Sequence, residues 1–496
     1  MKLNAQRSSS KTINYEGATS YKTDAKTELI SRVLCSLVGE KKFYVSGEDS
    51  NKELISLLRK VADTDIEFCL KLAAYARNEF HLRSIPQLIL IEMNNHPKIK
   101  GTGFITKYAP YIIKRADEIT ECMAYHLDNF GKPIPTRLKK AIASSFNRFS
   151  KYQISKYNRP GKVEMRDAMF LCHPKPIDDV HTDIFKKLAD KNLESPDTWE
   201  VIISGKGSTK ENWESVVDLW LESERFGNYF AGIRNLRNVL KVGINDELLD
   251  RLLKALRDPE NVKRSKLLPF RFLSAYKQIQ QIASPRTNKV LRTISSAMNQ
   301  SLVNLPELSG YTCIAVDLSG SMDSVLSDRS TVAYADVACV LGAALNKVTN
   351  AVVIGFGEKV GMATLDPEAS VLSSAQTIRG MPVGHSTNAY LAPMLLSSRK
   401  VKIDRFILLS DMQCWDSTWY SSREFTPDFR KYKNEFSPNC YLYSIDLAGY
   451  GKGIQVPQGE KNTVLLAGWS DRIFNFIANW ENERVSQVKM ISSYLS

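Results

Sequence analysis

The stretch that decides the fold is YTCIAVDLSGSMDS, residues 311–324, in which an apolar, β-rich run ends in alternating Asp and Ser residues. The same apolar character recurs in AVVIGFG (351–357), RFILLSD (405–411), CYLYSIDLAG (440–449) and NTVLLAGWS (462–470). Helical patterns lie between or after them, in STVAYADVACVLGAALNKV (330–348), NAYLAPMLLSSRK (388–400) and DRIFNFIANW (471–480). Apolar strands that alternate with helices predict a doubly wound α/β domain, with a parallel sheet covered on both faces, over residues 308–496.

The end of the first predicted strand carries a candidate metal site. Asp317, Ser319 and Ser321 alternate at i, i+2 and i+4, and ligands of open parallel sheets bind beyond the carboxyl ends of the strands. Thr387 adds a hydroxyl before a later helix, and Asp411 ends another apolar strand. Oxygen ligands with little formal charge suit Mg²⁺ or another divalent cation. The alternative is a strand-end turn whose Ser and Asp residues only cap helices.

This set of residues resembles the von Willebrand factor A domain, whose metal-ion-dependent adhesion site consists of DxSxS, a later threonine and a later aspartate. The resemblance implies that Ser319, Ser321 and Thr387 hold the cation, and that Asp317 and Asp411 act directly or through water. Ser386 could take the part of Thr387. In that family a carboxylate of a partner protein usually completes the coordination, so the site is expected to be a docking point.

The first 300 residues have a different pattern. Amphipathic helices such as TELISRVLCSLV (27–38) follow one another with short polar turns and without convincing strands. Thr64 to Glu67 resembles a capping box that opens a new helix. Such helix density predicts an all-α, HEAT-like domain of paired helices over residues 1–300.

The basic charge of the chain lies entirely in this helical region. The whole chain has a net charge of +13, whereas residues 301–496 hold 17 Lys and Arg against 19 Asp and Glu. Between residues 131 and 176, eleven Lys and Arg face two acidic residues, with Tyr and Phe interleaved. Cations along one track suit backbone phosphates, and aromatic rings offer stacking faces for unpaired bases. The alternative is a solvated basic surface without a polyanionic partner.

A second resemblance rests on four stretches: GATSYKTD (17–24), TRLKKAIASSFNRFSKYQISKYNRPGKVEMRDAMFLCHPKP (136–176), YFAGIRNLRNVLKVGI (229–244) and KLLPFRFLSAYKQI (266–279). They are similar to the TROVE module of the Ro autoantigen family, in which helical repeats close into a ring. That resemblance implies binding of small structured non-coding (Y-like) RNA outside the ring and of single-stranded 3′ ends of misfolded RNA in its hole. It also implies that Lys139, Lys140, Lys156 and His173 contact RNA. Neighbourhood and charge add Arg137, Arg159 and Arg166, whereas His173 could instead cap a helix end.

Few features of the sequence favour catalysis. It has no GxxxxGK[ST] phosphate loop, HExxH zinc helix or GxSxG nucleophile elbow. The scattered cysteines, and the lack of a signal sequence or a long apolar run, favour a cytoplasmic protein without a membrane span. We expect an RNA-binding protein of a ribonucleoprotein, in RNA quality control or as an adaptor whose metal site docks an exoribonuclease or another protein. The rivals are a protein–protein adaptor acting mainly through the metal site and a metal-dependent ribonuclease.

Overall fold

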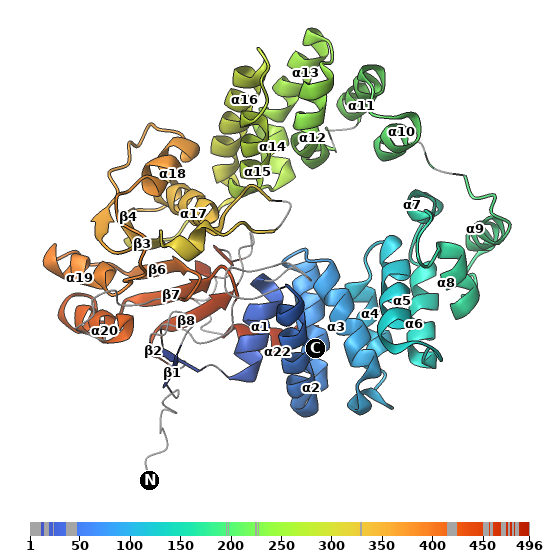
Figure 1. Cartoon of the computed structure of the whole chain (residues 1–496), viewed down its shortest axis with the longest axis horizontal. Helices are drawn as coiled ribbons and strands as arrows, with labels where there is room; N and C mark the ends of the chain where they lie inside the picture. Colours follow the sequence, from blue (N-terminus) through green and yellow to red (C-terminus); the bar gives the residue numbers. More distant parts are fainter. Residues whose placement is uncertain are drawn as a thin grey trace. The chain divides into compact units, whose positions relative to one another are not determined.

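The apolar stretches that follow residue 310 form the strands of one six-stranded sheet in the computed structural model (Figure 1). Its order is β5-β4-β3-β6-β7-β8, and all neighbours are parallel except β4 and β5 at one edge. The strands are β3 (Thr312–Asp317), β4 (Ala351–Phe356), β5 (Val360–Met362), β6 (Arg405–Ser410), β7 (Tyr441–Asp446) and β8 (Thr463–Ala467). The chain runs from β3 to β4 on one side and then to β6 on the other, so the strand order reverses between β3 and β6. The predicted doubly wound sheet is confirmed.

Helices cover both faces of this sheet, because both faces of the central strands are apolar (Figure 1). They are α17 (Tyr334–Val348), α18 (Val371–Arg379), α19 (Leu391–Ser398) and α20 (Phe425–Phe436). One face packs Ala315 and Phe406 against Phe429 of α20. The other face meets α17, where a Cβ on Gly342 would lie 3.2 Å from Val316 Cγ2, so this helix packs closely against β3.

The chain divides into two compact units, each made of two separate stretches. The first comprises Met1–Ser50 and Trp213–Gln487, and the second comprises Asn51–Asn212 and Val488–Ser496. The structure describes residues 11–13, 19–22, 24–35, 47–194, 196, 198–223, 226, 228–327, 330–413, 424–449, 456, 460–467, 473–474, 477–478, 481 and 486–495. Parts of GATSYKTD and NTVLLAGWS, and most of the predicted helix at 471–480, lie outside these residues.

The second unit consists of stacked helices. They are most of α2 (Gly47–Asn78), α3 (Ser84–Asn95), η1 (Pro97–Ile99), α4 (Phe104–Ile112), α5 (Asp117–Phe130), α6 (Thr136–Phe146), α7 (Lys151–Tyr157), α8 (Met165–Cys172), α9 (Asp179–Ala189), α10 (Trp199–Lys206) and α22 (Gln487–Ser492). Each of α3, α4 and α6 packs against the next helix but one, in the pairs α3–α5, α4–α6 and α6–α8. This is the stacking expected of helical repeats. Closure into a ring stays a prediction.

The predicted start of a helix near Thr64 is displaced by one residue. Helix α2 has a non-helical residue at Asp65, with φ −153° and ψ 81°. The Asp65 carboxylate accepts a hydrogen bond from Phe68 N at 3.0 Å and therefore caps the second half of α2. Thr64 instead donates from its hydroxyl to Val61 O at 2.9 Å. The capping residue is thus Asp65 rather than Thr64.

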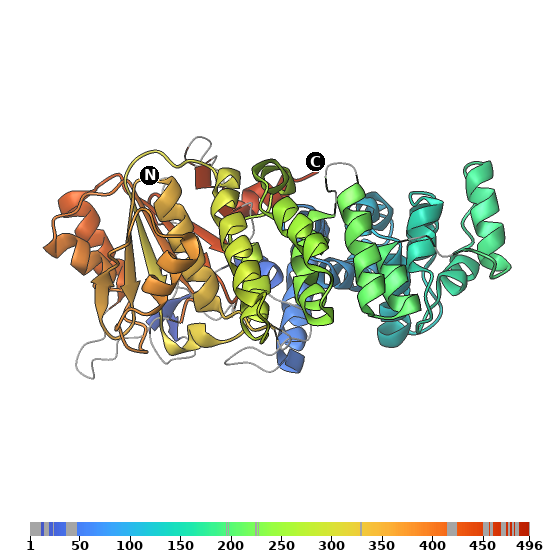
Figure 2. The same ribbon diagram turned by 90° about the horizontal axis from the view of Figure 1, so that it is seen from above.

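The first unit joins further helices to the sheet. They are α1 (Ala25–Cys35), α11 (Lys210–Glu222), α12 (Tyr229–Val242), α13 (Asp246–Leu256), α14 (Pro259–Ser265), α15 (Phe270–Gln280), α16 (Thr287–Gln300) and η3 (Ser301–Asn304), with a hairpin of β1 (Lys11–Ile13) and β2 (Thr19–Tyr21). Helices α12 to α16 stand side by side (Figures 1 and 2). Helix α1 packs against β8, and Ser31 donates to Asp446 at 2.6 Å. In the part of the chain that the structure describes, no helix has the length and apolarity to cross a membrane.

Candidate metal centre and candidate RNA interface

The predicted metal site begins where β3 ends, beside the point at which the strand order reverses. Asp317 is the last residue of β3, and its Oδ1 accepts a hydrogen bond from Ser319 N at 2.9 Å. The chain then turns into the short 3₁₀ helix η4 (Gly320–Asp323). The hydroxyl oxygens of Ser319 and Ser321 lie 3.3 Å apart, and both side chains are buried. The alternation at i, i+2 and i+4 thus brings a carboxylate and two hydroxyls together.

A second loop carries Thr387 toward this turn. Gly320 N donates to His385 O at 2.9 Å, and Asn388 N donates to Gly357 O at 3.0 Å, which fastens the loop to η4 and to the end of β4. The approach to β4 is very close, since a Cβ on Gly357 would lie 2.4 Å from Gly384 O. Only glycine fits at position 357 without displacing the backbone. Thr387 is buried and Ser386 is half-exposed.

The third element is the end of β6. Ser410 donates from its hydroxyl to Asp317 Oδ2 at 2.6 Å and accepts from Met412 N at 3.0 Å. Asp411 Oδ1 accepts from Gln413 N at 3.1 Å. Asp411 Oδ2 is buried and has no hydrogen-bond partner among the described residues. A buried carboxylate oxygen without a partner is costly unless a cation or water reaches it.

Both buried carboxylates of the site have a pKa above the usual value for aspartate. Burial raises the pKa of Asp317 to about 6, although hydrogen bonds from Ser319 and Ser410 oppose the rise. Burial and then the charge of Asp317 raise the pKa of Asp411 to about 8. A divalent cation would relieve this repulsion, and the carboxylate and hydroxyl oxygens are ligands of the kind that Mg²⁺ prefers. The donor set therefore fits the predicted cation.

Other residues of this site were missed by the sequence reasoning. Ser410 positions Asp317, and it immediately precedes a predicted ligand. Asp446 ends β7, and its charge contributes to the raised pKa of Asp411. Its Oδ1 accepts from Ala448 N at 3.0 Å and Gly449 N at 2.7 Å, so it is already satisfied by its own turn. A carboxylate directly after the apolar run CYLYSI was the available signal. Among the described residues, no three His, Cys, Asp or Glu side chains form a metal-binding group, so the candidate site depends on its hydroxyls.

The predicted RNA contacts fall on α6, α7 and α8 of the helical unit and on the turns that follow α7 and α8. Lys140 on α6 is exposed and Lys139 is half-exposed. Lys139 lies near Cys172, the last residue of α8, and its charge opposes the burial that raises the pKa of that thiol. Cys172 is followed directly by His173. His173 is exposed and adopts a left-handed conformation (φ 50°) where α8 ends. Lys139, Lys140 and His173 thus lie on an open part of the surface.

Three other predicted contacts are engaged within the fold. Arg137 donates from Nε to Asn94 O at 3.1 Å, and Arg166 donates from Nε to Ala189 O at 2.8 Å. Both carbonyls lie at the C-terminal ends of neighbouring helices, where cations are stabilised. Lys156 pairs with Glu200 at 2.7 Å and its side chain is only 16% exposed. A phosphate would have to compete with these partners.

Aromatic rings lie next to three of the predicted RNA contacts, and two of these rings are exposed. Phe170 is 47% exposed and the guanidinium of Arg166 lies 4.8 Å from its ring centroid. Tyr152 is 50% exposed, with the ammonium of Lys156 at 5.8 Å. The guanidinium of the exposed Arg159 lies 6.0 Å from the ring of Tyr157. The surface of α7 and α8 thus combines positive charge with aromatic faces, as unpaired nucleotides require.

Relatives of the chain include two curated proteins. The first is telomerase protein component 1 of Rattus norvegicus, 22% identical over 374 residues, which are 57% of this chain and 14% of that protein. The second is RNA-binding protein RO60 of Caenorhabditis elegans, 25% identical over 230 residues, which are 42% of this chain and 32% of that protein. The chain therefore spans only a minor part of the length of these relatives.

A solved structure and two family models complete the comparison. The Ro (RSR) protein of Deinococcus radiodurans covers 93% of this chain and 100% of its own, with a TM-score of 0.65 and 16% identity, which establishes the likeness of fold. The TROVE domain model matches residues 9–194 and 187–318, and the Ro60 vWA domain model matches residues 311–480. Because the TROVE match alone spans more than half of the chain and the vWA match follows it, the chain belongs to the Ro family of TROVE-domain proteins.

Proposed function

We propose that this protein binds RNA without transforming it, as a component of a ribonucleoprotein. The observation that carries the proposal is the surface of α6 to α8, which combines the accessible Lys139, Lys140 and His173 with the exposed rings of Tyr152 and Phe170. The excess of positive charge in the first 300 residues and membership of the Ro family support it. The name of the nematode relative, an RNA-binding protein, agrees with it.

The RNA class is the one that the resemblance to the Ro family implies, and the chemistry of the surface agrees with it. Phosphate contacts make the affinity salt-dependent, and aromatic faces favour unpaired bases. On the ground of that resemblance we propose small structured non-coding RNA and single-stranded 3′ ends of misfolded RNA as the ligands, and a role in RNA quality control or as an adaptor for an exoribonuclease. The resemblance to the Ro family supplies this expectation.

The test is a binding series with three labelled nucleic acids. A small structured RNA, the same RNA with a single-stranded 3′ tail and a DNA duplex are titrated at several salt concentrations. We expect tight binding of both RNAs, tighter with the tail, and a loss of affinity for Lys139→Glu and Lys140→Glu. Lys402→Glu is the matched control, because Lys402 is an exposed lysine of the α/β domain. Equal and weak binding of all three nucleic acids would refute the proposal.

A second function is favoured by the buried, unpartnered Oδ2 of Asp411. We propose that Mg²⁺ or another divalent cation binds Asp317, Ser319, Ser321, Thr387 and Asp411 and docks a carboxylate of a partner protein. The cation would supply a Lewis-acidic point of attachment, while the loops of the sheet hold its ligands. Titration calorimetry with Mg²⁺ tests the site, with Ser319→Ala as the variant that should lose binding. The rival ribonuclease predicts Mg²⁺-dependent RNA cleavage that the same variant abolishes.

A further inference from the structure

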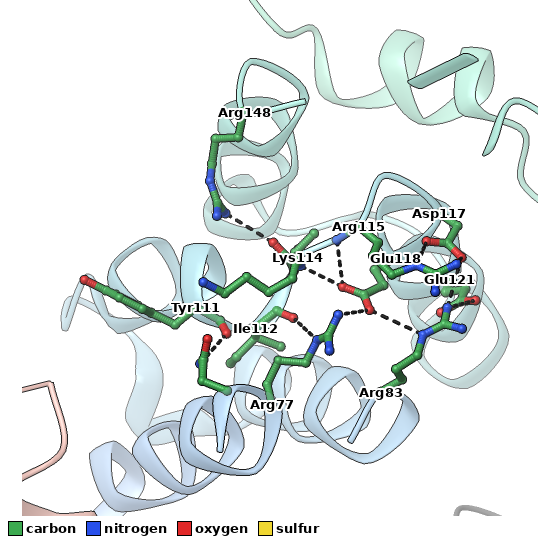
Figure 3. A network of polar contacts seen from close by, with 12 residues as sticks. Arg77, Arg83, Tyr111, Ile112, Lys114, Arg115, Asp117, Glu118, Glu121 and Arg148 are labelled. Atoms are coloured by element: carbon green, nitrogen blue, oxygen red, sulfur yellow. Dashed lines mark hydrogen bonds and ion pairs between the residues drawn. The ribbon is translucent and has the colours of Figure 1, made fainter. Parts of the chain in front are cut away.

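Cationic side chains gather at a second place in the helical unit, where α4 ends and α5 begins (Figure 3). This cluster lies outside the basic segment at residues 131–176, apart from one arginine just after α6. In Figure 3 its side chains surround the loop that joins the two helices. The positive members are Arg77, Arg83, Lys114, Arg115 and Arg148, and the negative members are Asp117, Glu118 and Glu121. The cations thus outnumber the carboxylates.

Three of the arginines form ion pairs with these carboxylates. Arg77 Nη2 lies 2.7 Å from the fully buried Glu118. Arg83 pairs with Asp117 at 2.9 Å and with Glu121 at 3.3 Å. Asp117 also forms an ion pair with Arg115 at 2.9 Å. Each carboxylate of the cluster is therefore paired with at least one of these arginines.

Those two cations are Lys114 and Arg148. Among the described residues, neither forms an ion pair with a carboxylate. Arg148 donates one N–H to Ile113 O at 3.2 Å, which leaves most of its five N–H donors for another acceptor. Desolvation and then the charge of Arg148 lower the pKa of Lys114, which shows that the two positive groups repel each other.

An aromatic ring stands beside this pair. Tyr111 is 38% exposed, and Lys114 Nζ lies 5.6 Å from its ring centroid. Figure 3 shows the ammonium of Lys114 between the Tyr111 side chain and the Arg148 guanidinium. The loop itself is held in place, because Glu118 accepts hydrogen bonds from Lys114 N at 2.7 Å and Arg115 N at 3.1 Å. The arrangement is thus fixed before any ligand arrives.

We propose that Lys114, Arg148 and Tyr111 form a binding site for one unpaired nucleotide of single-stranded RNA. The backbone phosphate lies between the ammonium and the guanidinium, and the base stacks on the exposed tyrosine ring. The inference rests on the proposed RNA-binding function and adds to it a named site for one nucleotide. A duplex satisfies the two cations but leaves the tyrosine without a base, so unpaired RNA is preferred.

The site adjoins the surface already proposed to bind RNA. Arg115, next to Lys114, stacks its guanidinium 4.6 Å from the ring centroid of Tyr157 on α7. Arg148 follows the end of α6, the helix that carries Lys139 and Lys140.

The experiment measures binding of an unstructured oligoribonucleotide, of an RNA duplex and of a DNA duplex to the full chain by fluorescence anisotropy over a salt series. Lys114→Gln, Arg148→Gln and Tyr111→Leu each remove one part of the site. Lys114→Arg and Tyr111→Phe keep the charge and the ring. The matched control is Lys107→Gln, since Lys107 lies on α4 and pairs with Glu67 at 3.0 Å.

We expect each of the three disrupting variants to bind the unpaired RNA about tenfold more weakly. Tyr111→Leu should leave binding of the duplex unchanged, whereas Lys114→Gln and Arg148→Gln should weaken it as well, because the phosphates of a duplex also contact the two cations. The two charge variants should also reduce the salt slope by about 0.7, the value of one phosphate contact on a single strand, whereas Tyr111→Leu should not. The two conservative variants should bind like the wild type, and the melting temperature of each variant checks that it folds.

Two results would overturn the inference. If the wild type prefers RNA and Lys139→Glu weakens binding, but the Lys114, Arg148 and Tyr111 variants behave like Lys107→Gln, the site is wrong and the proposed function stands. If the wild type binds unpaired RNA no better than it binds duplex DNA, the proposed function and this site both fail.

Discussion

Replacing Glu118 by glutamine is a direct test of how the helical unit is held together. The Glu118 carboxylate is fully buried and accepts hydrogen bonds from Arg77 Nη2 and from the backbone nitrogens of Lys114 and Arg115 (Figure 3). Arg83 Nε also lies near this carboxylate, 3.6 Å from Glu118 Oε1. An amide offers one acceptor oxygen, so its NH₂ group must face either the guanidinium or the two backbone N–H groups. Both positions set donors against donors.

The cost follows from burial. Breaking a buried ion pair by removing one partner costs about 3–5 kcal/mol, because the other charge stays buried without compensation. For a unit of this size, each kcal/mol lowers the melting temperature by about 2–4 °C, so we expect a loss of about 6–20 °C. Glu121→Gln is the control: Glu121 also meets an arginine, at 3.3 Å, but both side chains are well exposed, so its loss should cost at most about 1 kcal/mol.

Two assays measure this effect. Thermal unfolding followed by circular dichroism gives the difference between Glu118→Gln and Glu121→Gln. Hydrogen exchange should then show faster exchange of the Lys114 and Arg115 amides, which lose their acceptor, and binding of unpaired RNA should weaken because the Lys114 loop is released. If Glu118→Gln melted within about 2 °C of the control, the network would not carry the stability that we assign to it.

Three further predictions concern the candidate metal centre. At a hundredfold excess over its Kd, Mg²⁺ should stabilise the folded wild type by about 2.7 kcal/mol and so raise its melting temperature. Differential scanning fluorimetry should show this rise for the wild type but not for Ser319→Ala. In EDTA, stability should fall as the pH rises from about 4 to 8, because the folded pKa values of Asp317 (about 6) and Asp411 (about 8) exceed the unfolded value of 3.8, and the folded state therefore binds more protons across this range. A melting temperature in EDTA that rises over this pH range would contradict the prediction. Gly357→Ala should weaken Mg²⁺ binding in calorimetry without removing any ligand, because its Cβ would displace the backbone at Gly384 and with it the Thr387 loop; unchanged affinity would show that this loop has no part in the site.

Much of the secondary structure could be predicted from the sequence, because its causes are local. The apolar runs that end at Asp317 and Ser410 form buried parallel strands, as their continuous hydrophobicity indicates. The gathering of Asp317, Ser319 and Ser321 follows from their spacing in one turn. Asp411 joins them because both central strands end at the same edge of the sheet.

The partners of charged residues could not be predicted in this way. Charge and spacing do not tell that Arg137 caps Asn94 O or that Lys156 pairs with Glu200, since these partners come from other helices. The roles of these two cations in RNA binding stay predictions that must compete with those contacts. The same holds for Ser410, whose contact with Asp317 joins two neighbouring strands.

The sequence by itself therefore determined the type of each region: amphipathic helices and positive charge before residue 300, and apolar strands with a DxSxS turn after it. Only the tertiary structure decided which distant residues meet. It packs α1 against β8, so that Ser31 contacts Asp446, and it brings Lys114 beside Arg148 with no carboxylate paired to either among the described residues. The physical reason is that periodicity and capping act over a few residues of chain, whereas burial and pairing depend on how separate elements pack.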